Sequence, residues 1–180
     1  MKIPLEAIKG LREKTGASIG DVKSALEASG GDEAKALAAL REKGFEIAKQ
    51  KAERSARQGR IESYIHHDGR VGAIVEVNCE TDFVARLPEF QQFCKDLAMQ
   101  VTATNPTCLK KEELSSAQLE DAKKLGKPAE ELAREACLLE QLLIKDQGQT
   151  VGQSLTSLIA KTGENIVIRR FARFIVGEPR

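Results

Sequence analysis

The chain has 180 residues, which is enough for one compact domain and a small second one. Hydrophobic residues make up 41% of it and charged residues 31%, which is typical of a soluble globular protein. The 28 Lys and Arg residues nearly balance the 27 Asp and Glu residues, so the composition argues against a dedicated nucleic-acid binder, which usually carries a basic excess.

Membrane and export signals are missing from the sequence pattern. No apolar run approaches the roughly 18 residues that a membrane span needs. The first residues, Met1-Lys2-Ile3-Pro4, lead directly into a charged amphipathic pattern and not into a signal-peptide core. The four cysteines have no CxxC spacing, which is typical of free thiols in a reducing compartment. We expect a cytoplasmic protein that binds neither a membrane nor, directly, a nucleic acid.

Residues 1–44 show the pattern of three short helices. An apolar stripe ends at Thr15-Gly16, and Ser18 can cap a second helix with Asp at the third position after it. A third helix can begin at Asp32 and end at Lys43-Gly44. The pattern predicts a small three-helix module with a minimal core.

Residues 45–58 continue as a polar, basic helix that Gly59 would close. A helix with almost no apolar face is poorly buried and bridges domains. The basic stretch Lys49–Arg60 has the charge to contact RNA or an acidic partner. A solvated linker helix is the interpretation that we favour.

Apolar residues then recur at every second position. Ile61–Ile65 and Val71–Cys79 alternate in this way, and the Asp68-Gly69 turn signal lies between them, which predicts a β-hairpin. Residues 89–104 return to helical spacing, and Asn105-Pro106 breaks that helix.

The last part of the chain mixes helices with one strand. Helices are predicted at about 110–125 and 128–144, and Thr150 can cap another. The segment Asn165–Val176 is rich in β-formers and is expected to pair with the hairpin. The fold class is therefore α+β, and residues 59–180 form a core domain with a small antiparallel three-stranded sheet flanked by helices.

The sequence lacks the usual motifs of catalysis. No phosphate-binding glycine loop, HExxH or GxSxG occurs. Neighbouring residues on a strand point to opposite faces, so His66 and His67 fit surface positions better than a metal site. Cys79 can be read as a nucleophile, but a core cysteine is the favoured interpretation. We predict that the protein is not an enzyme and that it binds no cofactor and no metal.

A short segment after the second strand permits two interpretations. Thr81 or Asp82 can cap a helical turn, which places Phe83 in its first turn. Phe83 can then pack beneath the helix that starts near Pro88, which the pattern alone favours, or face outward.

This segment, Asn78-Cys79-Glu80-Thr81-Asp82-Phe83-Val84-Ala85, resembles the signature of bacterial elongation factor Ts. Further motifs of that family follow one another in the right order over nearly the whole chain. They are Leu11–Ala17, Asp21-Val22-Lys23, Ala25-Leu26, Arg41–Gly44, Gly163–Phe171 and Val176-Gly177-Glu178.

The resemblance implies a guanine-nucleotide exchange factor that acts on elongation factor Tu during translation elongation. The N-terminal module would be similar to ubiquitin-associated domains and would dock on the partner's GTPase domain. The implied docking residues are Leu11, Arg12, Thr15, Gly16 and Ile19. The turn of Thr81, Asp82, Phe83 and Val84 would enter near the partner's magnesium site and dislodge the ion.

The chain departs from the family pattern in places. Ser18-Ile19-Gly20 stands where the family usually has Gly-Met-Met, and Leu142 stands where it usually has Pro. Only one copy of the core domain is present, as in short members, which are expected to form homodimers and two-to-two complexes. Ala172 offers no thiol, so no disulfide is expected at that strand. The alternative function is a non-exchanging adaptor that binds a translation component through the three-helix module.

Overall fold

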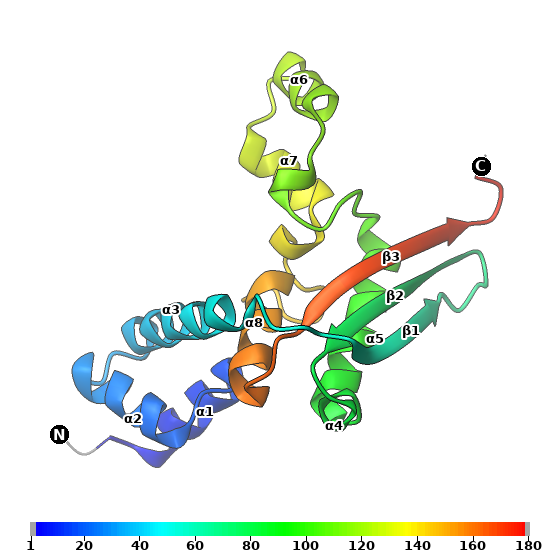
Figure 1. Cartoon of the computed structure of the whole chain (residues 1–180). Coiled ribbons are helices and arrows are strands. Elements are labelled where there is room, and N and C mark those ends of the chain that lie inside the picture. Colours follow the sequence, from blue (N-terminus) through cyan, green and yellow to red (C-terminus); the bar gives the residue numbers. More distant parts are fainter. Residues whose placement is uncertain (1–2, 179–180) are drawn as a thin grey trace.

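The computed structural model describes residues 3–178. The first two residues of the predicted N-terminal module and the last two residues of the predicted core domain lie outside the described residues. Helices and strands come in separate runs along the chain, and the strands form one antiparallel sheet flanked by helices, so the predicted α+β class is confirmed (Figure 1). Two elements, η1 and η2, are short 3₁₀ turns. The elements are α1 (Leu5–Thr15), α2 (Ile19–Ala28), α3 (Glu33–Lys51), β1 (Gln58–Ile65), β2 (Val71–Cys79), α4 (Asp82–Ala85), α5 (Pro88–Thr104), η1 (Lys111–Glu113), α6 (Ser116–Lys124), α7 (Ala129–Ala136), η2 (Leu138–Glu140), α8 (Val151–Thr162) and β3 (Val167–Ile175).

The N-terminal helices form the predicted small module. The Ser18 hydroxyl caps α2 by accepting a hydrogen bond from the backbone N–H of Asp21, 3.1 Å away. The Asp32 carboxylate caps α3 in the same manner. Both caps satisfy N–H groups that a helix start leaves unpaired. The module's own core consists of Leu11, Val22, Leu26, Ala36 and Leu40.

The predicted stop at Gly44 and the separate linker helix are wrong. Instead, α3 runs without a break through Gly44 to Lys51. Gly44 is buried against α8, where an added Cβ would lie 3.5 Å from the Cγ2 atom of Thr156. One side of α3 therefore packs on α8 instead of lying in solvent. Residues 52–57 follow without regular structure, and Gly59 belongs to β1, where its backbone has φ +145°.

The three strands form one antiparallel sheet in the order β1-β2-β3, as predicted. Tyr64 lies opposite Ala73 in the hairpin, and Ile74 lies opposite Ala172 in β3. The turn closes where Gly69, with φ +69°, donates its N–H to the carbonyl of His66 at 2.8 Å. Glycine reaches this left-handed conformation without the steric cost that a Cβ imposes.

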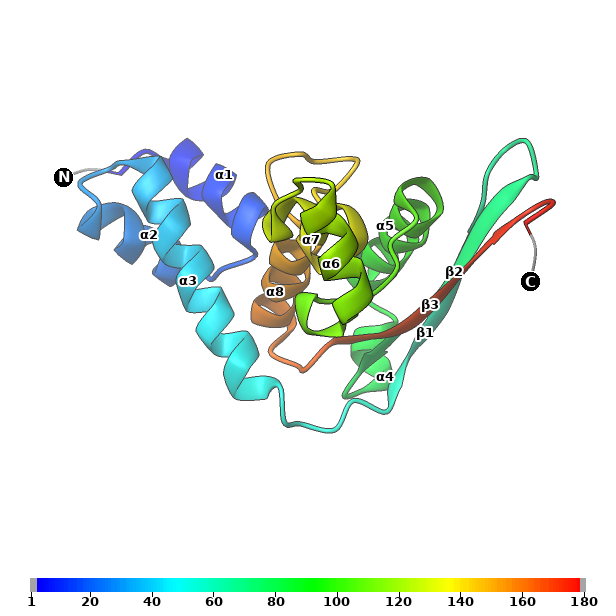
Figure 2. The ribbon, with the colours of Figure 1, turned by 90° about the horizontal axis from the view of Figure 1, so that it is seen from above.

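The main core lies between one face of the sheet and α5 and α8. Its largest fully buried members include Phe90 and Leu97 on α5 and Val75 and Val77 on β2. Figure 2 shows α5 along this face, while no helix of residues 3–178 covers the opposite face. That outer face carries exposed apolar side chains, namely Ile61, Ile65, Ile74 and Phe174.

Helices α6 and α7 form an arm that projects from the body (Figure 1). The helix predicted to reach residue 144 ends at Ala136, because Cys137 adopts an extended conformation and pairs with Cys108. The first helix of the arm starts at Ser116, where Ser115 and Gln118 make a capping box. We call residues 108–137 the α6–α7 arm.

Candidate functional site

The site begins with the short helix α4, which follows β2 directly. The hydroxyl of Thr81 accepts a hydrogen bond from the N–H of Val84 at 3.3 Å, so Thr81 is the cap and Asp82 is not. Val84 is only 7% exposed and anchors the turn in the core. Because the side chain of Val84 points into the core, the side chain of the residue before it points toward solvent.

Phe83 is that outward residue, and its exposed fraction is 77%. The interpretation favoured by the pattern alone, in which Phe83 packs beneath the next helix, is therefore wrong. An aromatic ring held outward on a short, capped turn is a rigid contact group with few rotatable bonds. The ring is therefore free to contact another molecule.

Asp82 lies beside Phe83 at the start of α4. Its carboxylate is 2.8 Å from the guanidinium of Arg86, and both side chains are largely exposed. An exposed ion pair of this kind contributes less than about 1 kcal/mol, so Asp82 can exchange it for other contacts at low cost.

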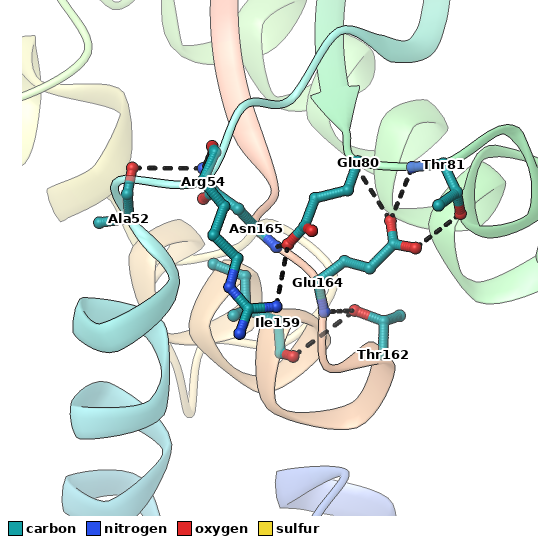
Figure 3. Close-up of polar contacts among 8 residues, drawn as sticks. All are labelled: Ala52, Arg54, Glu80, Thr81, Ile159, Thr162, Glu164 and Asn165. Atoms are coloured by element: carbon teal, nitrogen blue, oxygen red, sulfur yellow. Dashed lines mark hydrogen bonds and ion pairs between the residues drawn. The ribbon is translucent and has the colours of Figure 1, made fainter.

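A carboxylate from a distant segment fixes the turn. Glu164 follows α8 and accepts hydrogen bonds from the backbone N–H groups of Glu80 and Thr81, both at 3.0 Å (Figure 3). Its other oxygen accepts the hydroxyl proton of Thr81 at 2.6 Å. Hydrogen bonds to an ionised acceptor are the strong kind, so the orientation of the turn is set by the end of α8.

A second polar contact ties the same region to the end of α3. The Glu80 carboxylate accepts the backbone N–H of Asn165 at 2.7 Å and lies 3.8 Å from the guanidinium of Arg54 (Figure 3). The Asn165 amide donates to the carbonyls of Ala52 and Arg54. We call Glu80, Glu164 and Asn165 the clamp, because together they join α3, the end of α8 and the turn.

Cys79 lies beneath this clamp and is fully buried, as the core interpretation predicts. Burial, together with the nearby negative charge of Glu164, raises the pKa of the Cys79 thiol to about 11. The thiol also donates to the carbonyl of Thr81 at 3.1 Å. A buried thiol that remains protonated is a poor nucleophile, and His66 lies at the other end of the hairpin.

The residues implied for N-terminal docking do not all reach the surface. Leu11 and Thr15 are 2% and 5% exposed, and the Thr15 hydroxyl bonds to the carbonyl of Leu11. Gly16 faces α8, where an added Cβ would lie 3.1 Å from the carbonyl oxygen of Ser157. These three positions hold the module together and seat it on α8, so any part they have in docking is indirect.

Two of the five docking candidates remain available for direct contact. Arg12 is exposed, and Ile19 is 57% exposed at the start of α2. Docking through these two side chains stays a prediction. Because α8 packs on α3 and on Gly16 and leads into the clamp, the same helix supports the N-terminal module and the Phe83 turn.

Comparison with known proteins identifies the family. The family model described as "Elongation factor TS" matches residues 14–136, which include the whole turn. The chain is 48% identical to Elongation factor Ts of Caldanaerobacter subterraneus subsp. tengcongensis, with 98% of each chain covered. It is 45% identical to the protein of that name from Rubrobacter xylanophilus, over 97% of this chain and 99% of the relative. The chain belongs to the elongation factor Ts family.

As a member of the elongation factor Ts family, the chain is a translation elongation factor. The resemblance expected from its motifs is thereby confirmed, and the matches cover 98% and 99% of these two relatives, which is consistent with a short form. A third relative, Elongation factor Ts of Thermodesulfovibrio yellowstonii, is 43% identical over 99% of this chain and 98% of its own.

The clamp is the part of the site that sequence reasoning missed. Glu164 and Asn165 were noted only as part of a family motif, since nothing local shows that a residue after Gly163 meets one at position 80. Within residues 3–178, no three His, Cys, Asp or Glu side chains gather as metal ligands. Over the same residues, no helix has the length and apolar character to cross a membrane.

Proposed function

We propose that this member of the elongation factor Ts family is a guanine-nucleotide exchange factor for elongation factor Tu. It would promote GDP release by inserting Asp82 and Phe83 near the magnesium site of the partner. The observation that carries this proposal is the 77% exposed ring of Phe83 on a turn that Glu164 holds through the N–H groups of Glu80 and Thr81 and the Thr81 hydroxyl. The site of action would be the cytoplasm, where elongation takes place.

The free energy available from burying Phe83 can be compared with the coupling free energy that GDP release requires. Burying one large apolar side chain contributes about 1.5–3 kcal/mol. Weakening GDP binding a thousandfold requires about 4 kcal/mol of coupling. Phe83 alone falls short of that value, so the rest of the surface must hold the ring in place. Arg12 and Ile19 on the N-terminal module are the candidates for this additional contact.

The rigidity of the turn supports the mechanism. A loop that is ordered only on binding loses part of its interaction energy to conformational entropy. Here Glu164 already holds the backbone of Glu80 and Thr81, and Val84 anchors the turn below. Little conformational entropy would therefore be lost when the turn binds, and more of the free energy of contact would remain to weaken magnesium binding by the partner.

No covalent chemistry is needed for this activity. Exchange is a coupling between two binding equilibria, so bound GDP must weaken the grip of this chain on elongation factor Tu by the same factor. The proposal requires no nucleophile, general base or cofactor on this chain. It is accordingly a binding protein that accelerates dissociation and not an enzyme in the usual sense.

We also propose that two copies of the chain pair through the outer face of the sheet, which would give a two-to-two complex with elongation factor Tu. Ile61 and Ile65 of β1, Ile74 of β2 and Phe174 of β3 are exposed on that face. Apolar side chains gathered in this way mark interaction sites on soluble proteins. A second copy offers a self-complementary partner for such a face.

The decisive assay follows release of labelled GDP from elongation factor Tu in an excess of unlabelled GDP. The release rate should rise with the concentration of this chain and saturate. An unchanged release rate would overturn the proposal. The adaptor alternative is separated by binding: an exchange factor prefers nucleotide-free elongation factor Tu to the GDP form, whereas an adaptor binds both equally.

A further inference from the structure

Two cysteine thiols face one another at the base of the α6–α7 arm. Cys108 and Cys137 are partners in an isolated parallel β-bridge, and their Sγ atoms are 3.4 Å apart. Cys137 is fully buried, whereas Cys108 is only partly buried. The other two cysteines, Cys79 and Cys94, are buried in the main core. The pair at the arm is thus the one with an opening toward solvent.

The backbone spacing at this point suits a covalent bond. Strands joined by a β-bridge lie about 4.8 Å apart. Disulfides connect residues whose Cα atoms are about 4.4–6.8 Å apart, with a sulfur–sulfur bond of about 2.05 Å. Small rotations of the side chains of Cys108 and Cys137 bring the sulfur atoms from 3.4 Å to bonding distance without a change in the fold.

We propose that Cys108 and Cys137 form an oxidisable thiol pair, and that a low-molecular-weight disulfide converts it to an intramolecular disulfide. In the first step the Cys108 thiolate attacks one sulfur of the small disulfide, forms a mixed disulfide and releases one small thiolate. In the second step the sulfur of Cys137 attacks that of Cys108 and releases the second small thiolate. The two cysteine protons pass to the two released thiolates, so the protein is oxidised by two electrons and the small disulfide is reduced.

The surroundings of the two thiols assign their order of reaction. Cys108 is the one that a small disulfide can reach. Burial raises the pKa of Cys137 to about 12, and so does the adjacent Cys108 sulfur, to which the protonated Cys137 thiol can donate, so Cys137 is a poor first attacker. It becomes effective only when the mixed disulfide stands next to it, because the reaction is then intramolecular.

The new bond would close residues 108–137 into a covalent loop. At present backbone hydrogen bonds join the two ends of the arm, among them Thr107 N–H to the Ala136 carbonyl at 2.9 Å and Leu138 N–H to the Cys108 carbonyl at 3.0 Å. Most side chains between these ends are exposed, and the arm stands away from the sheet (Figure 1). A disulfide at the base removes the open conformations of the arm and leaves the Phe83 turn untouched.

The test uses the full chain and oxidised glutathione under native conditions. Oxidation should lower the intact mass of the chain by about 2 Da. When the reaction is then quenched with a thiol-blocking reagent, the oxidised chain should carry two fewer blocked thiols than the reduced chain. Peptide mapping should place the bond between Cys108 and Cys137. Amide hydrogen exchange in α6 and α7 should slow after oxidation, while exchange in the sheet stays the same.

Cys108→Ser is the matched control, since a hydroxyl replaces the thiol at nearly the same size. It should show neither the mass loss nor the slower exchange in the arm. A glutathione adduct that persists on Cys108, a bond between Cys79 and Cys94, or no oxidation at all would overturn the proposal. If Cys108→Ser fails to fold, the peptide map of the wild-type chain still decides the question.

Discussion

Glu164 and Thr81 are 83 positions apart in the sequence, yet the Glu164 carboxylate accepts both the backbone N–H and the hydroxyl of Thr81, at 3.0 Å and 2.6 Å. Thr81 is also the cap of α4, so one residue links the end of α8 to the turn that exposes Phe83. The Glu164 contact and the cap therefore both act on the backbone that presents the Phe83 ring.

Replacing the carboxylate tests the clamp. Glu164→Ala leaves the N–H groups of Glu80 and Thr81 without their acceptor, and hydrogen bonds to a charged group are worth about 1.5–3 kcal/mol each. Because these groups are only partly buried, water can replace some of the lost bonds, and we expect the free energy of unfolding in urea to fall by roughly 2–4 kcal/mol, less than the full sum. Hydrogen exchange at these two amides should accelerate.

Glu164→Gln is the matched control for that substitution, because its amide oxygen can still accept both N–H groups. It should lose about 1 kcal/mol and keep most of the amide protection. Equal protection in the alanine and glutamine variants would contradict the assignment of Glu164 as the residue that positions the turn. This readout uses the free chain, so it does not depend on the proposed exchange activity.

Local signals in the sequence predict most of the elements. The caps at Ser18, Asp32 and Thr150 and the Asp68-Gly69 turn all mark real boundaries, because each acts within three or four residues. Gly44 misleads, since a glycine buried inside a continuous helix looks the same in sequence as one that ends a helix.

The site was predictable only in part, for the same reason. Phe83 was found through the family signature, while periodicity favoured burying it. The resemblance assigns Leu11 and Thr15 to docking, but Leu11 belongs to the module's core and Thr15 is buried. The contact between Glu164 and Thr81 arises from the path of α8 and β3, and no pattern within a short window reveals it.

Two glycine substitutions distinguish packing from backbone conformation. At Gly44 an added Cβ meets the Thr156 methyl at an ordinary 3.5 Å, so Gly44→Ala should raise the free energy of unfolding by about 0.5–1 kcal/mol through helix propensity. At Gly59 an added Cβ would lie within 3 Å of the backbone at Val77 and Asn78, and φ is +145°. Gly59→Ala should therefore lower the free energy of unfolding by more than about 2 kcal/mol. Urea unfolding measures both, and a destabilised Gly44→Ala would contradict the room for a Cβ that the structure shows between α3 and α8.

Stability should fall at alkaline pH because of the buried thiols. Burial raises the pKa of Cys79 to about 11 and that of Cys94 to about 12, from 9.0. Above pH 9 the unfolded chain loses thiol protons that the folded chain keeps, so the free energy of unfolding decreases as pH rises. Urea midpoints at pH 8, 9 and 10 measure the slope. Cys94→Ala should make the slope shallower, and an unchanged slope would contradict this account.

The outer face of the sheet gives a prediction about association. Ile74→Lys places a charge at its centre, where the side chain is 45% exposed, so the fold should persist while pairing of two copies is lost. Light scattering should give a dimer for the wild-type chain and a monomer for this variant. Ile19→Lys, on the N-terminal module, is the control and should remain a dimer. A monomeric wild-type chain would exclude the proposed pairing.

The rate of GDP release from elongation factor Tu in the presence of Phe83→Ala tests the central claim most directly. Phe83 is exposed, so the variant should keep its stability within about 0.5 kcal/mol. Stimulation of release should fall roughly ten- to hundredfold, which corresponds to losing about 1.5–3 kcal/mol of apolar burial. Phe45→Ala, which removes a 61% exposed phenylalanine from α3, should stimulate release as well as the wild-type chain. If Phe83→Ala stimulates release at the wild-type rate, insertion of the turn is not the mechanism.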